Sequence, residues 1–259
     1  MRVATFNLLH GRSLAHGRVE REELVAAARE LDADLLGLQE VDRLQQRSGS
    51  EDQTAAVAAA LGAPHWRFVP ALHGTPGDPA AVASTVDDGA TTTGPSYGVA
   101  LVSRLPVLAW RVRRFPAAPV PMPLMVPGRR GLVPVRDEPR VAVAAVVEGP
   151  RGPLTAVTAH LSFVPGWNVA QLRALTRWAA RLPAPRLMFG DFNLPGPLPR
   201  WTSRWTQLAR LATYPSYRPR VQFDHVLADG IEEAAVHDVQ ALHLPVSDHC
   251  AVRVDLRLP

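Results

Sequence analysis

The sequence predicts a sheet-rich α/β layered domain. Apolar, strand-like runs recur along nearly the whole chain, and helical patterns lie between only some of them. Of the 259 residues, 47% are hydrophobic, which is ample for a sizeable core. The strand-like runs keep the same character throughout the chain, so we expect a single domain over residues 1–259.

The strand-like runs are short, apolar, and often bounded by Gly, Pro, Asn or Asp. They cover residues 2–9, 33–41, 65–72, 97–103, 107–115, 140–148, 154–162, 185–192, 222–228, 233–240 and 249–258. The last run contains Cys250, the single cysteine, which excludes an internal disulfide and a zinc–thiolate cage. We expect Cys250 to be a small buried apolar side chain.

Helical patterns cover residues 18–32, 52–62 and 168–182. In the first, Leu24, Ala27, Ala28 and Leu31 recur at helical spacing. Gly62 supplies a stop signal for the second, and Asn168 is expected to cap the amphipathic third.

Two long segments interrupt this succession of strand and helix patterns. Residues 73–96 are polar and Gly-rich, and residues 116–139 are Pro-rich. Loops this long within a compact domain are usually functional or disordered. Strand-like material resumes after each of them, so neither is interpreted as a linker between domains.

The net charge is +4 at pH 7, and every basic side chain other than histidine is arginine. Arginine favours bidentate contacts with phosphate, so the composition permits an anionic substrate without requiring one. The chain has no dense basic tail, no apolar run long enough to span a bilayer and no signal-peptide pattern. We therefore expect a cytoplasmic protein with no membrane association and no obligate protein partner.

Polar side chains interrupt the apolar strands, mostly near their ends. They are Asn7, Gln39, Glu40, His160, Asp191, Asn193, Asp224, Ser247, Asp248 and His249. Such side chains cost free energy when buried unless they are paired, and sites in layered α/β folds gather where strands end. An oxygen-rich set favours Mg²⁺ or Mn²⁺ over zinc, and acid–histidine pairs suit general acid/base catalysis.

Each of these residues also has a structural alternative. In "FGDFNLP", Asp191 and Asn193 are two residues apart and point to one side of an extended chain. The same stretch is also typical of a turn, because Gly, Asp, Asn and Pro are all turn residues. A single histidine such as His160 is more often a hydrogen-bonded core residue than a catalytic one.

Seven stretches together carry a family resemblance: "ATFNLLHG", "LLGLQEVD", "YGVALVSRLPV", "TAHLS", "FGDFNLP", "FDHVLA" and "SDHCAV". In this order, from Asn7 to His249, they resemble the endonuclease/exonuclease/phosphatase superfamily, which includes deoxyribonuclease I and inositol polyphosphate 5-phosphatases. "TFNLLHG" and "HLSFVPGWN" most resemble its bacterial metal-dependent hydrolases. The resemblance implies a deoxyribonuclease I-like α/β fold, a four-layer sandwich of two mixed β-sheets flanked by helices.

The resemblance also implies a metal site. Glu40 would be the principal ligand of Mg²⁺ or Mn²⁺, with Asn7 nearby and Asp248 completing the metal environment. Mg²⁺ keeps several waters and uses one or two carboxylates, so a single firm glutamate ligand is sufficient.

Five residues would be catalytic by the same resemblance. Asp191 would orient or deprotonate the attacking water, and Asn193 would hold that water or a phosphate oxygen. His249 would contact the scissile phosphate, oriented by Asp224. His160 would donate to a phosphate oxygen or assist the leaving group.

Three further residues are candidates for substrate binding, each with an alternative. Abasic-site endonucleases usually carry an Asp where this chain has Leu9, and His10, which follows, either approaches the site or faces a turn. Tyr97 either contacts phosphate or belongs to the core, and Arg140 either binds phosphate or is a surface cation.

Two nearby features are left outside the site. The Arg129–Arg130 pair in a Pro/Gly-rich loop is more typical of a solvated surface than of a substrate contact. His225 is adjacent to Asp224, so it should point to the opposite face of its strand.

The sequence thus predicts a metal-dependent phosphoester hydrolase, with a phosphodiesterase or nuclease as the preferred form. The alternatives are a small-molecule or lipid-headgroup phosphatase and, in a different class, a non-catalytic binding protein on the same fold. The expected partner is a phosphoester, either nucleic acid or a small mono- or diester.

Overall fold

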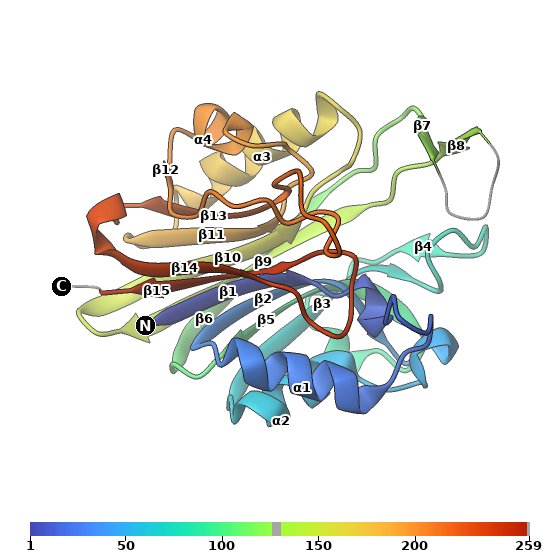
Figure 1. Cartoon of the computed structure of the whole chain (residues 1–259), viewed down its shortest axis with the longest axis horizontal. Coiled ribbons are helices and arrows are strands. Elements are labelled where there is room, and N and C mark those ends of the chain that lie inside the picture. The colour runs from blue at the N-terminus through green and yellow to red at the C-terminus, as the bar shows by residue number, and fades with distance from the viewer. Residues whose placement is uncertain (126–130, 258–259) are drawn as a thin grey trace.

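Two β-sheets pack face to face, and helices cover the outer face of each sheet (Figure 1). The computed structural model describes residues 1–125 and 131–257. The order of layers is helix, sheet, sheet, helix, which confirms the expected four-layer sandwich.

The first sheet has seven strands in the order β14-β15-β1-β2-β5-β3-β4. Its strands are β1 (Arg2–Asn7), β2 (Leu35–Arg43), β3 (His65–His73), β4 (Val82–Ala83), β5 (Ser96–Ser103), β14 (Val236–Leu242) and β15 (Ala251–Leu256). The β1–β2 pair is parallel and the other pairs are antiparallel, so the sheet is mixed.

The second sheet has six strands in the order β12-β13-β11-β10-β9-β6. Its strands are β6 (Val107–Phe115), β9 (Arg140–Gly149), β10 (Gly152–His160), β11 (Arg186–Asp191), β12 (Thr206–Gln207) and β13 (Asp224–Asp229). Here β10 and β11 are the parallel pair. The register sets His160 opposite Asp191 and Asp191 opposite Asp224, so three polar side chains lie together at one edge of the sheet, where β10 and β11 end and β13 begins.

Helices lie on both outer faces. The first sheet is covered by α1 (Arg21–Leu31) and α2 (Gln53–Leu61), and the second by α3 (Trp167–Ala179) and α4 (Leu198–Ser203). Short 3₁₀ helices occupy η1 (Leu9–Gly11), η2 (Gln46–Ser48), η3 (Gly89–Thr91) and η4 (Glu233–Ala235). Within the described part of the chain, no helix is long and apolar enough to cross a bilayer.

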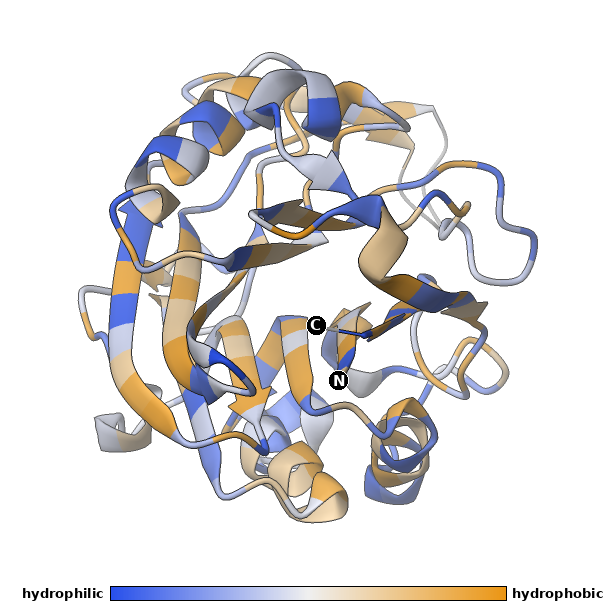
Figure 2. Ribbon diagram, turned by 90° about the vertical axis from the view of Figure 1, so that its left-hand side faces the viewer, coloured by the Kyte–Doolittle hydropathy of each residue, from blue (hydrophilic) through white to orange (hydrophobic). Residues whose placement is uncertain are grey.

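One hydrophobic core lies between the two sheets, whose strands are coloured largely as hydrophobic in Figure 2, and two more lie under the helices. The sheets approach closely at Gly37 on β2. A Cβ added there would lie 2.4 Å from Thr158 Oγ1 and 2.7 Å from the Phe189 ring. The absence of a side chain at Gly37 therefore lets β2 pack against the second sheet.

The predicted capping of α3 by Asn168 is wrong. The helix begins at Trp167 after Gly166, and Asn168 lies inside its first turn. The Asn168 Nδ2 instead donates to the Asn193 carbonyl at 2.8 Å, so the amide holds the loop that follows β11. Helix α4 was not predicted, because the prolines around it obscure the helical pattern, although Pro is well accepted in a first helical turn.

All eleven predicted strands are present, with ends displaced by a few residues. The Pro-rich segment 116–139 is not only loop. It contains β7 (Met122–Met125) and β8 (Leu132–Val135), a separate antiparallel hairpin that projects from one end of the sandwich (Figure 1). The segment 73–96 likewise contains β4 and η3.

Candidate active site

A cleft of about 800 Å³ lies beside the β7–β8 hairpin, where strands of both sheets end. Strand β1 ends at Asn7, β10 at His160 and β11 at Asp191. The carboxyl ends of parallel strands meet at one edge of a sheet, and packing the two sheets face to face brings both edges together.

Asn7 joins the two sheets through Glu40 and Asp191, which line this cleft. Its Nδ2 donates to Glu40 Oε1 and to Asp191 Oδ2, both at 3.0 Å, and its Oδ1 accepts from the Leu9 N–H at 3.1 Å. Glu40 has φ of +53° within a register shift of β2, an unusual conformation for a residue with a side chain. Asn7 therefore sets the spacing between carboxylates that come from different sheets.

His249 and Asp224 form a buried acid–histidine pair. The His249 Nδ1 lies 2.8 Å from Asp224 Oδ2, and its Nε2 lies 3.8 Å from Asp191 Oδ2. Ser247 fixes the preceding turn, because its hydroxyl donates to the Asn7 carbonyl at 2.6 Å and accepts from the His249 N–H at 3.0 Å. Burial alone would lower the pKa of His249, but the carboxylates of Asp224 and Asp191 raise it to about 10. The ring is therefore a cation at neutral pH.

The stretch after β11 is both a turn and part of the cleft. Asp191 Oδ1 accepts from the Asn193 N–H at 2.9 Å, and Asn193 has φ of +50°. The Asn193 Nδ2 donates to the Leu161 carbonyl at 3.0 Å and lies 3.2 Å from His160 Nε2. These contacts leave the Asn193 amide oxygen available to the cleft, since both N–H groups are engaged.

His160 is neutral in this arrangement. Burial lowers its pKa well below the usual range, and the cations of Arg140 and His249 lower it further. Its Nε2 accepts from Asn193, so its proton is on Nδ1. His160 is thus a buried, hydrogen-bonded histidine that also lines the cleft.

The three candidate substrate-binding residues line the same cleft. Arg140 is not a surface cation, because it is only 5% exposed and its Nη2 donates to Asp137 Oδ1 at 3.0 Å. Its Nε is buried without a hydrogen-bond partner among the described residues. Tyr97 is 7% exposed. His10 has φ of +48° in a turn, and its backbone carbonyl accepts a hydrogen bond from the Gln53 side chain.

Two features, the Arg129–Arg130 pair and His225, were predicted to lie outside the site. The Arg129–Arg130 pair lies outside the described residues. His225 faces away from Asp224, as strand alternation predicts: its Nε2 donates to the Leu194 carbonyl at 2.8 Å and its ring stacks on Phe192. Cys250 is buried and free, as expected.

Several cleft residues were not predicted: Arg47, Phe163, Asn168, Glu138 and Tyr214. The Tyr214 ring packs against His249 at 4.9 Å between centroids. Arg47 is held by two hydrogen bonds to Asp42. Asp42 lies two residues after Glu40 in "QEVD", and this position was the one feature of the sequence that could have pointed to Arg47. The others come from loops and a helix start, where no strand pattern points to them.

The donor set fits a divalent cation. Burial above all, together with the neighbouring carboxylates of Asp248 and Asp191, raises the pKa of Glu40 to about 7, although the Asn7 hydrogen bond and the charge of His249 oppose the rise. A cation beside these oxygens would relieve that repulsion, and carboxylate oxygens suit Mg²⁺ or Mn²⁺. Asp191, Asp224 and His249 also lie close enough to hold an ion, but Asp224 and His249 are already bonded to each other.

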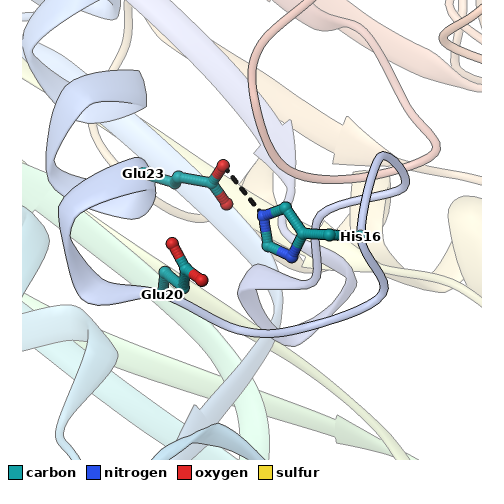
Figure 3. Close-up of side chains that lie close together, drawn as sticks. All are labelled: His16, Glu20 and Glu23. Atoms are coloured by element: carbon teal, nitrogen blue, oxygen red, sulfur yellow. Dashed lines mark hydrogen bonds and ion pairs between the residues drawn. The ribbon is translucent and has the colours of Figure 1, made fainter.

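A second cluster, His16, Glu20 and Glu23, lies at the start of α1 (Figure 3). The Arg18 N–H donates to His16 Nδ1 at 3.2 Å, so the proton of the neutral ring is on Nε2. That Nε2 lies 3.1 Å from Glu23 Oε1, and Glu20 pairs with Arg18 at 3.0 Å. These contacts account for the cluster without a metal ion.

A family model of the endonuclease/exonuclease/phosphatase family matches residues 4–249. The chain belongs to this family. Members of the endonuclease/exonuclease/phosphatase family are hydrolases that act on phosphoesters, and the two mixed sheets are those of its fold. A search of curated proteins found no match.

Several solved structures share the fold of this chain. An endonuclease/exonuclease/phosphatase from Beutenbergia cavernae DSM 12333 is 24% identical with a TM-score of 0.67, covering 100% of this chain and 71% of that one. A functionally unknown conserved protein from Enterococcus faecalis V583 is 15% identical with a TM-score of 0.67 and covers 100% of both chains. A mannosyl-6-phosphatase from Bacteroides thetaiotaomicron VPI-5482 is 14% identical with a TM-score of 0.61, again over 100% of both.

Proposed function

We propose that the protein is a Mg²⁺- or Mn²⁺-dependent phosphoester hydrolase. The observation that carries this proposal is the position of Asn7, whose Nδ2 lies 3.0 Å from both Glu40 and Asp191. A candidate metal ligand and a candidate base are thereby held side by side in one cleft, facing the His249–Asp224 pair.

Glu40 and Asp248 would hold the metal ion, which supplies positive charge to offset the charge that develops on the phosphate. Asn7, which the resemblance places near the metal, would act on the metal ligand Glu40. Its Oδ1 is engaged by Leu9 and its Nδ2 faces the carboxylates, so it orients Glu40 rather than contributing an oxygen.

Asp191 orients and deprotonates the attacking water. Each of its oxygens accepts one hydrogen bond, from Asn7 and from Asn193, so the carboxylate cannot rotate away from the cleft. Burial raises its pKa, which brings its basicity nearer to neutral pH. The free amide oxygen of Asn193 accepts a hydrogen bond from the same water.

Two cations bind the phosphate. His249 donates its Nε2–H to a non-bridging oxygen, while Asp224 fixes the ring through Nδ1. Arg140 presents a buried guanidinium whose Nε is otherwise without a partner. His160 is neutral, so in this state it acts by holding Asn193.

Hydrolysis of chromogenic esters tests this proposal. The assay compares bis-p-nitrophenyl phosphate and p-nitrophenyl phosphate in Mg²⁺, Mn²⁺ or EDTA, with His249→Ala and with the exposed control His237→Gln. We expect hydrolysis that EDTA and His249→Ala abolish and that the control retains. Absence of hydrolysis together with absence of metal binding would instead support a non-catalytic binding protein on this fold.

A further inference from the structure

The cleft is much larger than a phosphate group needs. Beside Glu40 it extends over His10, Arg47, Tyr97 and Glu138, which we call the side subsite. Tyr97 on β5 lies opposite Asp42 on β2, two residues beyond Glu40, so the side subsite directly adjoins the candidate metal ligand. Whatever group is attached to the phosphate must be accommodated here.

The charge of Arg47 is already balanced. Its Nε and Nη2 donate to the two oxygens of Asp42, both at 2.8 Å, and Asp42 is fully buried. The guanidinium also lies over the Tyr97 ring at 5.8 Å. Arg47 is thus a fixed group at the rim of the cleft that offers its Nη1 as a hydrogen-bond donor and carries little free positive charge.

Arg140 is paired with Asp137, whose side chain is completely buried, through one hydrogen bond of 3.0 Å from Nη2 to Oδ1. The next residue, Glu138, lines the cleft and has no side-chain hydrogen bond among the described residues. Its carboxylate attracts the guanidiniums of Arg140 and Arg47, which are already paired with Asp137 and Asp42, so it adds a third negative charge against two cations. The remaining cation nearby, Arg136, is exposed to solvent, which weakens its attraction for a bound group.

This arrangement disfavours a second anionic group and favours hydroxyl groups. A second phosphate would meet the Glu138 carboxylate, and the one guanidinium of the side subsite as defined, that of Arg47, is already paired with Asp42. A hydroxyl can donate to Glu138 and accept from Arg47 at the same time. Tyr97, together with Leu124 and Val135 of the hairpin, supplies apolar surface for carbon–hydrogen groups.

We infer that the substrate is a phosphoester of an uncharged polyhydroxylated group, such as a sugar or cyclic polyol, selected by Glu138 and Arg47. The inference rests on the proposed hydrolase function and deepens it. Of the two substrate classes expected from the sequence, it selects the small phosphoester. A nucleic acid would need an open basic face, whereas this cleft is lined by the hairpin and its side subsite carries no excess of positive charge.

A matched substrate series tests the inference. It contains glucose 6-phosphate, glucose 1,6-bisphosphate, phenyl phosphate, glycerophosphoinositol as a polyol diester, and supercoiled plasmid, each with Mn²⁺. We expect kcat/KM for a polyol ester to exceed that for phenyl phosphate and for the bisphosphate by about tenfold or more. A preference for the bisphosphate, or nicking of the plasmid as the best reaction, would overturn the inference.

Variants identify the selecting residues. Glu138→Gln should raise KM for the polyol ester and reduce its preference over the bisphosphate by about tenfold, because the repelling carboxylate is lost. Glu148→Gln is the matched control, since it makes the same change at the exposed far end of β9. Arg47→Gln is not a suitable variant, because it leaves the buried Asp42 carboxylate unpaired and risks unfolding.

Different results would contradict the hydrolase function and the substrate selection by the side subsite. If neither the nitrophenyl esters nor any natural ester is hydrolysed, the hydrolase function itself is wrong. If the nitrophenyl esters are hydrolysed but Glu138→Gln and Glu148→Gln have the same substrate preference as the unmodified protein, the hydrolase stands and the side subsite has no selective role.

Discussion

The Nδ1 atom of His249 lies 2.8 Å from the Oδ2 atom of Asp224, and both side chains are buried. The two residues come from different sheets, since His249 precedes β15 and Asp224 begins β13. Sandwich packing therefore creates this pair, and the pair keeps a cationic imidazole beside the candidate base.

Asp224→Asn tests this relationship. An amide has nearly the same size but no charge, so the pKa of His249 should fall from about 10. The imidazolium would then be lost as pH rises through that lower pKa, and the alkaline limb of the rate profile should move to lower pH. We expect kcat to fall by about 10²- to 10⁴-fold.

The control for that variant is Asp238→Asn, which makes the same change at an exposed position of β14. Identical kcat and identical pH profiles for both variants would show that the pair has no role in the reaction.

Asn7→Ala should weaken metal binding. The substitution removes the two 3.0 Å hydrogen bonds that orient Glu40 and Asp191. Loss of a group that orients a metal ligand typically costs about 10–100-fold in affinity. Calorimetric titration with Mn²⁺ measures this, with exposed Gln46→Ala as control. Equal affinities in the two variants would contradict the orienting role of Asn7.

Gly37→Ala should destabilise the fold without touching the cleft. The new methyl group would lie 2.4 Å from Thr158 Oγ1 and 2.7 Å from the Phe189 ring, so the sheets must separate. Overpacking of this kind costs about 1–3 kcal/mol of unfolding free energy. Urea unfolding measures the loss, and Gly94→Ala, where nothing lies within 4 Å, is the matched control. A midpoint unchanged by Gly37→Ala would show that the interface repacks freely.

His225 should make the fold sensitive to mild acid. Burial lowers its pKa to about 4 from the ordinary 6.5, although its contact with Leu194 and the charge of Asp224 oppose this. The fold thus prefers the neutral ring. The stability that comes from this preference is fully present above about pH 6.5 and is lost as the pH falls through about 4. It amounts to on the order of 3 kcal/mol of unfolding free energy.

His225→Gln keeps a donor for the Leu194 carbonyl but removes the titrating ring. Unfolding free energies measured between pH 7 and pH 4 should therefore fall less steeply for His225→Gln than for the exposed control His237→Gln. Parallel pH curves would exclude His225 as the source of acid sensitivity.

Much of the fold could be predicted, because strands buried between two layers leave uninterrupted apolar runs. The polar residues that end those runs, such as Asp191 and His160, were visible for the same reason. The cap at Asn168 was mispredicted because its amide is used by Asn193, a partner 25 residues away. Local pattern cannot reveal such a contact.

The side subsite was hidden for a related reason. Arg47 belongs to the cleft only because Asp42 holds it there, and Glu138 only because Asp137 and Arg140 fix the end of β9. From the sequence alone, Arg47 and Glu138 are charged residues near loops, and such residues usually lie on the solvated surface. Tertiary packing decides which surface charges become part of a binding cleft.

The most direct measurement compares hydrolysis of bis-p-nitrophenyl phosphate by the unmodified protein and by Asp191→Asn in saturating Mn²⁺, with Mn²⁺ binding measured on both. Asn has nearly the size of Asp but cannot accept the proton of water. We predict that both proteins bind Mn²⁺ and that hydrolysis falls by at least about 10²-fold in the variant. Equal rates in the two proteins would contradict the assignment of Asp191 as the base and with it the proposed mechanism.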